Sequence, residues 1–69
     1  TRVAKVGTMQ TTRIFVQNSS TTGDWTSYSL SSDVYLHKGS TVLKTSDFKI
    51  DDTVTIYYAD GMVYEVVKQ

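Results

Sequence analysis

Residues 53–67 read TVTIYYADGMVYEVV, and this stretch decides the fold of the chain. In its first part Val54, Ile56 and Tyr58 alternate with Thr53, Thr55 and Tyr57, which is the period-two pattern of a strand with one buried face. Asp60-Gly61 then provides two residues that tolerate the positive φ angles of a tight hairpin turn, and 63–67 resumes as a strand. The sequence therefore predicts a β-hairpin here, with Val63 and Val67 in one phase and Tyr64 in the other.

Weaker strand patterns precede this hairpin, and helix formers are scarce beside the many valines, threonines and tyrosines. The predicted strands are Arg2 to Thr8, Thr11 to Gln17 with Ile14 and Val16 inward, Trp25 to Leu30, Val34 to His37, and Thr41 to Leu43. Polar residues between them predict a long loop over 18–24 and turns over 31–33 and 38–40. Asp47 is expected to cap a single helical turn, with Phe48 and Ile50 tucked under the sheet.

These elements predict an all-β fold: a small, partly closed antiparallel β-barrel of OB or SH3 type with five or six short strands. A small β-sandwich is the alternative. Closure is favoured because an open sheet of this size would expose one apolar face and two unpaired edges. The length of 69 residues allows one domain, 1–69. Because the chain starts without methionine and Val3 already fits a strand, we expect this domain to be excised from a larger multidomain protein.

The composition argues against catalysis and against metal binding. The chain has no cysteine and a single histidine, so neither a Cys-based metal site nor a multi-histidine site can form. His37 lies at a predicted strand end beside Lys38, where a solvated turn residue is expected rather than a catalytic base. No apolar run is long enough to span a bilayer. The sequence thus predicts no enzyme activity, no catalytic residue, no metal, no cofactor and no membrane insertion.

Charge offers one candidate patch. Seven basic residues balance seven acidic ones, which gives no overall attraction to phosphate and disfavours nucleic acid as a partner. Arg2, Lys5 and Arg13, however, have no acidic neighbour before Asp24. These three form the candidate basic patch.

Exposed aromatic side chains are the second candidate feature, because rings on a strand surface can stack on sugars or nucleobases. Trp25, Tyr57 and Tyr64 are the predicted ligand-binding aromatic face. The alternative is structural: Tyr57 and Tyr64 would form a cross-strand pair that stabilises the sheet, and Trp25 would fill the core.

The stretch from Leu30 to Val67 resembles small β modules of secreted, S-layer-type and cell-wall-associated bacterial surface proteins. The segments that carry the resemblance are turns and core positions, in the order Leu30-Ser31-Ser32-Asp33-Val34, Lys38-Gly39-Ser40, Ser46-Asp47-Phe48-Lys49-Ile50, Asp52-Thr53-Val54-Thr55-Ile56 and Asp60-Gly61. One position departs from the pattern, since Asp51 stands where those modules have glycine. An aspartate can adopt the left-handed conformation there at a cost of roughly 1 kcal/mol.

The resemblance implies a non-catalytic structural, spacer or binding module, located extracellularly or at the cell surface in a cell wall or S-layer. Its implied partners are other domains of the same polypeptide, and cell-wall polysaccharide or protein. Two alternatives stay open from the residues themselves. One is an OB- or SH3-like barrel that binds single-stranded nucleic acid, and the other is a carbohydrate-binding module.

Overall fold

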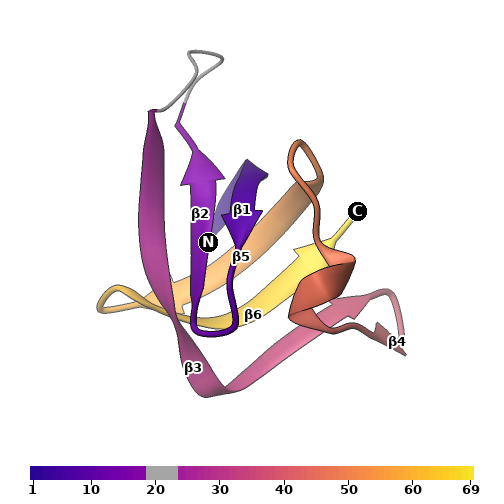
Figure 1. Ribbon diagram of the computed structural model, residues 1–69. Coiled ribbons are helices and arrows are strands. Elements are labelled where there is room, and N and C mark those ends of the chain that lie inside the picture. The colour runs from indigo at the N-terminus through magenta and orange to yellow at the C-terminus, as the bar shows by residue number, and fades with distance from the viewer. Residues whose placement is uncertain (19–23) are drawn as a thin grey trace.

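The computed structural model describes residues 1–18 and 24–69, which form strands and one short 3-10 turn (Figure 1). The elements in chain order are β1 (Arg2–Met9), β2 (Arg13–Gln17), β3 (Trp25–Lys38), β4 (Thr41–Val42), the 3-10 turn η1 (Thr45–Asp47), β5 (Thr53–Ala59) and β6 (Met62–Lys68). Most of the loop predicted over 18–24 lies outside the described residues.

Five of the strands close on themselves in the order β2-β1-β5-β6-β3, with β3 pairing back to β2. β4 has two residues and pairs with the end of β3, at the edge that β6 does not occupy. The predicted all-β small barrel is therefore confirmed. Its pairs are antiparallel except β3–β6, which is parallel and departs from the wholly antiparallel prediction. A three-strand meander whose last strand lies parallel to the final barrel strand is the connectivity of the OB-fold rather than of an SH3-like barrel.

The barrel interior is a single apolar core to which every barrel strand contributes. Burying aliphatic side chains in this way is the main source of stability in a fold without disulfides. The buried residues are Val6, Ile14, Val16, Leu30, Leu36, Phe48, Val54, Ile56, Val63 and Val66. Of the inward positions predicted from alternation in β2 and β5, Ile14, Val16, Val54 and Ile56 are confirmed, whereas Tyr58 is 39% exposed.

The C-terminal hairpin forms as predicted, with Asp60 at φ 54° and Gly61 at φ 77° in its turn. Its pairing register shifts by one residue, so that Tyr57 faces Glu65, Tyr58 faces Val63, and Tyr64 has no partner in β5. This β-bulge changes the phase of β6. Val66, rather than the predicted Val67, is therefore the second inward residue of the strand.

β3 is one long strand, so the turn predicted over 31–33 was wrong. Figure 1 shows the strand bending sharply in the middle and continuing along a different side of the barrel. The register with β6 shifts between Leu30 and Tyr35, at the bend. An irregularity of this kind lets a strand change direction without ending, and the small polar residues there resemble a turn in sequence.

The segment between β4 and β5 covers the barrel from one side. Phe48 is buried after η1, as predicted, but Ile50 is 60% exposed, which contradicts the prediction that it packs under the sheet. A tight turn explains the difference. The Asp52 amide donates to the Lys49 carbonyl at 3.1 Å, and the Lys49 amide donates to Asp52 Oδ2 at 2.8 Å. Within 1–18 and 24–69, no helix has the length and hydropathy needed to cross a bilayer.

Candidate binding face

The outer surface of β2 and the first half of β3 presents a short row of aromatic and polar side chains. Since Ile14 and Val16 point into the core, their neighbours Arg13, Phe15 and Gln17 point outward. On β3 the residues opposite them are Ser29, Ser27 and Trp25, and on β1 Thr8 faces Phe15. We call this surface the β2–β3 face and define it by Thr8, Arg13, Phe15, Gln17, Trp25 and Ser27.

Trp25 lies across this face and covers Gly7 of β1. A Cβ atom built on Gly7 would come within 2.6, 2.7 and 2.9 Å of the indole atoms Cδ2, Cε2 and Cε3. Three such similar distances place the glycine directly beneath the ring. The bulge in β1 between Val6 and Thr8 is at this same position. Trp25 keeps 37% of its surface exposed, so one side of the indole packs on backbone while the side chain remains accessible.

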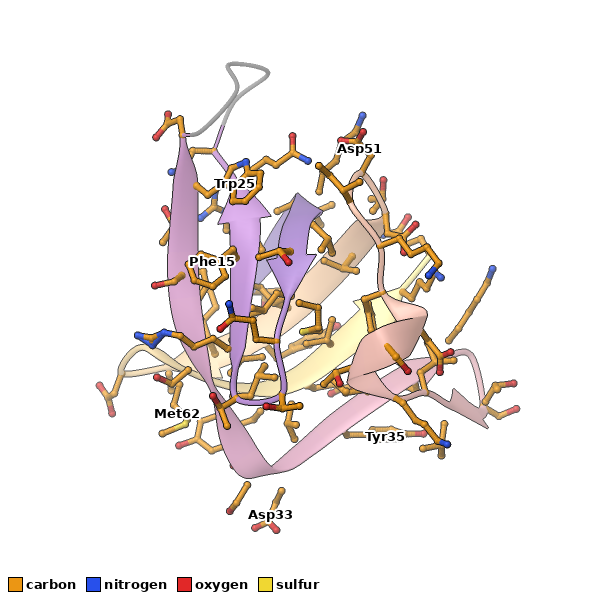
Figure 2. The ribbon with its side chains drawn as sticks, viewed as in Figure 1. Phe15, Trp25, Asp33, Tyr35, Asp51 and Met62 are labelled. Carbon is orange, nitrogen blue, oxygen red and sulfur yellow. The ribbon has the colours of Figure 1, made fainter. Side chains whose placement is uncertain are left out.

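Phe15 is the other aromatic residue of this face, and Figure 2 shows Trp25 over the end of β2 and Phe15 between β2 and β3. Phe15 faces Ser27 directly, which makes Trp25 its diagonal neighbour across the β2–β3 pair. Diagonal positions are roughly 7–8 Å apart, within reach of aromatic side chains. Sequence reasoning missed Phe15. The available signal was its position out of phase between the inward Ile14 and Val16.

Polar side chains are fixed at the Trp25 end of the face. Gln17 Nε2 donates to the Val6 carbonyl and to Asp51 Oδ1, both at 2.8 Å. Asn18 Nδ2 donates to Asp24 Oδ1 at 3.3 Å, and Thr26 Oγ1 donates to Asn18 Oδ1 at 2.8 Å. Amide and carboxylate groups therefore lie at the same end of the barrel as Trp25.

The three basic residues singled out from the sequence do not converge. Arg2 lies in the inward phase at the barrel end and donates from Nη1 to Tyr28 Oη at 3.1 Å and from Nη2 to Asn18 Oδ1 at 2.7 Å. Lys5 faces Gln17 on the outside, at the Trp25 end. Arg13 lies on β2 four residues from Gln17, which is about 13 Å along the strand. Its Nη1 donates to Ser29 Oγ at 3.2 Å. Lys5 and Arg13 thus lie at opposite ends of the aromatic pair.

Tyr57 and Tyr64 lie away from Trp25, on β5 and β6. Both are exposed, at 42% and 53%, and no ring pair joins them in the described part of the chain. The bulge at Tyr64 removes the register that would set them opposite each other. The observed pair is Tyr28–Tyr58, with ring centroids 5.0 Å apart and planes at 39°. The predicted trio therefore does not share one face.

His37 is a half-buried residue of β3, not the solvated turn residue predicted. Its Nε2 lies 2.6 Å from Glu65 Oε2, and its Nδ1 lies 2.7 Å from the Gly39 carbonyl oxygen. The ring of Tyr35 stacks on the imidazole, with the two ring centroids 3.9 Å apart. The hydrogen bond to the Glu65 carboxylate, followed by that to the Gly39 carbonyl, raises the pKa of His37 above its ordinary value of 6.5. Both ring nitrogens face acceptors, and among residues 1–18 and 24–69 no hydroxyl is hydrogen-bonded to the imidazole, so the arrangement is that of an imidazole–carboxylate ion pair.

Near β5, the Lys49 amide and the Lys68 ammonium contact the Asp52 carboxylate. The hydrogen bond from the Lys49 backbone is the main cause that lowers the pKa of Asp52, and Lys68 Nζ at 3.3 Å adds to it. Among residues 1–18 and 24–69, no group of three or more His, Cys, Asp or Glu side chains is placed to hold a metal ion. Asp52 is therefore part of a turn and an ion pair.

No family model matches this chain, and neither a curated protein nor a solved structure shows significant similarity to it.

Proposed function

We propose that this chain is a non-catalytic binding module and that the β2–β3 face is its ligand-binding surface. The observation that carries the proposal is the indole of Trp25, held flat over Gly7 with ring surface exposed beside Phe15. Aromatic side chains at diagonal positions of two paired strands provide preformed surfaces on which a ligand ring can stack. A platform that is already ordered loses little conformational entropy when it binds.

The position of the platform supports the proposal independently. OB-folds bind oligonucleotides and oligosaccharides on the outer face of their second and third strands, which correspond to β2 and β3 here. A fold hosts many functions, so this correspondence supports the location of the face and leaves the ligand to be argued from its residues.

We propose a bacterial surface or secreted protein as the setting, with cell-wall polysaccharide as the first ligand class to test. Two features support this: the resemblance of residues 30–67 to surface modules, and a chain with no net charge. Other domains of the same polypeptide are the proposed structural partners. A cell-wall protein is the further candidate.

Trp25 is the sole tryptophan of the chain, so fluorescence excited selectively at tryptophan, and not at the five tyrosines, reports on the platform. Soluble cell-wall polysaccharide fragments are expected to quench or shift its emission. Phe15→Ala should weaken binding about tenfold, as expected for the loss of a stacking ring. Tyr57→Ala is the matched control, because Tyr57 is an exposed aromatic on β5, away from the platform, and should leave binding unchanged. Equal loss in both variants would contradict the assignment of the face.

Single-stranded nucleic acid is the second candidate, favoured by Lys5 and Arg13 at the two ends of the aromatic pair. It predicts affinity that falls steeply with salt, with a slope reduced by about one in Arg13→Gln. Binding of oligo(dT) that varies little between low and moderate salt would remove this candidate. If no ligand perturbs Trp25, the binding proposal fails and a spacer role is the alternative that remains.

A further inference from the structure

We infer that the β2–β3 face takes a pyranose chain without acidic groups, and that the Gln17–Asp51 pair is the element that recognises its hydroxyl groups. The inference rests on the proposed function, because it assigns a ligand class to the same face. It adds a specificity determinant, Asp51, which lies on the loop before β5 rather than on β2 or β3.

The side chain of Gln17 links Asp51 to the platform. Gln17 faces Trp25 directly across β2 and β3, and its Nε2 donates to Asp51 Oδ1 at 2.8 Å. The backbone holds the loop in place as well, because the Asp51 amide donates to the Val6 carbonyl at 2.8 Å. Figure 2 shows Trp25 and Asp51 at the same end of the barrel. A ring stacked on the indole would therefore have the carboxylate at its edge.

The Gln17–Asp51 pair leaves two oxygen acceptors without a donor from the described residues. Within the described residues, no group donates to Gln17 Oε1 or to Asp51 Oδ2. Asp51 is exposed, so its Oδ2 is open to solvent or a ligand, while Gln17 is half-buried. Neighbouring hydroxyl groups of a pyranose are donors that match two adjacent acceptors, while the C–H face of the sugar ring suits an aromatic platform.

The backbone conformation of Asp51 does not require a carboxylate side chain. Its φ of 72° lies in the left-handed region, where glycine is the favoured residue. Gln17 Nε2 would keep its bond to the Val6 carbonyl if the carboxylate were absent. The carboxylate is thus not required to hold Gln17, although it is placed at a conformational cost.

The charges at this end of the face disfavour an anionic ligand. Lys5 and Arg2 are balanced there by Asp24 and Asp51, and Arg2 is already engaged by Tyr28 and Asn18. Binding of polyanions depends chiefly on an excess of positive charge, which is missing here. Binding of a neutral sugar does not depend on such an excess of positive charge.

The test compares three probes by Trp25 fluorescence and amide chemical-shift mapping: cellotetraose, an acidic tetragalacturonate, and oligo(dT). We expect the neutral sugar to bind and to shift residues of β2, β3 and the 49–52 turn. Asp51→Gly should reduce its affinity about tenfold, the loss expected for one charge-assisted hydrogen bond, and Asp51→Asn should reduce it less because one acceptor remains.

Asp60→Gly is the matched control. Asp60 is also exposed and in the left-handed region, at φ 54°, but it lies in the β5–β6 turn. Both glycine variants should unfold close to the wild-type midpoint, because relief of the backbone cost is offset by greater freedom of the unfolded chain. Asp60→Gly should bind sugar as the wild type does.

Separate outcomes overturn the two proposals. If the neutral sugar binds equally well to Asp51→Gly, or if the acidic sugar binds more tightly, the assignment of ligand class and of Asp51 is wrong while the face stands. If no probe perturbs Trp25, or if the shifts map to β5 and β6, the binding face itself is wrong.

Discussion

His37 and Glu65 form a hydrogen-bonded pair, with Nε2 and Oε2 2.6 Å apart, that links β3 to β6 along the parallel edge of the barrel. The second ring nitrogen is held by the Gly39 carbonyl. An imidazolium has two N–H donors for these two acceptors, whereas a neutral ring has one. The pair therefore favours the charged histidine.

This preference predicts a stability that depends on pH. The folded-state pKa of His37 lies above 6.5, so its stabilising contribution is complete below about pH 6.5 and is lost as the pH rises through the folded value. The free energy of unfolding, measured by urea titration, should therefore fall over that interval. His37→Gln and Glu65→Gln should both flatten the profile there. An unchanged profile in both variants would show that the pair does not contribute.

Gly7→Ala should displace the indole of Trp25. The added methyl would need space that ring carbons occupy at 2.6–2.9 Å, so the variant should lose about 1–3 kcal/mol of stability through overpacking. Trp25 emission should shift to longer wavelength as the ring becomes more hydrated. Thr55→Ala, on β5 and outside the β2–β3 face, is the control and should leave the emission in place. A native-like spectrum in Gly7→Ala would mean that the ring is not fixed on the glycine.

Ile56→Ala should come close to unfolding the protein. Ile56 is fully buried at the centre of β5, and removing a buried isoleucine side chain costs roughly 2–5 kcal/mol. A domain of this length has a total stability of about 3–10 kcal/mol. Thr55→Ala, the outward neighbour, should cost far less. Circular dichroism during chemical denaturation measures both, and similar losses would mean that the core is misassigned.

Tyr28→Phe should remove one hydrogen bond while keeping the ring. Tyr28 Oη accepts from Arg2 Nη1, and Arg2 retains its second bond to Asn18, so a loss of about 1 kcal/mol is expected. Tyr64→Phe is the comparison, since Tyr64 is exposed and should tolerate the change. Calorimetric unfolding distinguishes them. A larger loss in Tyr64→Phe would point to an unrecognised contact of that hydroxyl.

Local pattern predicted much of the fold. Alternation placed Ile14, Val16, Val54 and Ile56 inward, and Asp60-Gly61 adopts the positive φ angles that the turn requires. The errors arise where the period of two is interrupted. The bulge at Tyr64 moves the inward position to Val66, and the bend of β3 keeps 31–33 in a strand, because both depend on pairing with distant residues.

The candidate face was predictable in part. Trp25 was expected from its type and position, but the proximity of Gly7, Phe15 and Asp51 follows from register across three strands and a loop. The parallel β3–β6 pair and the contact between His37 and Glu65 likewise depend on long-range closure. Asp51 did give a local signal, an aspartate where a left-handed residue was expected, and its φ of 72° agrees with that expectation.

The pairing of Arg2 with Ile56 has a consequence for how the chain acquires its shape. As the ribosome adds residues, β1 has its neighbour β2 early but lacks its second neighbour until β5 has been made. One edge of β1 therefore stays unpaired until residues 53–59 have been synthesised. Closure of such distant segments is slow compared with helix formation, on the order of milliseconds to seconds, so the barrel is expected to close only after β5 and β6 have been synthesised.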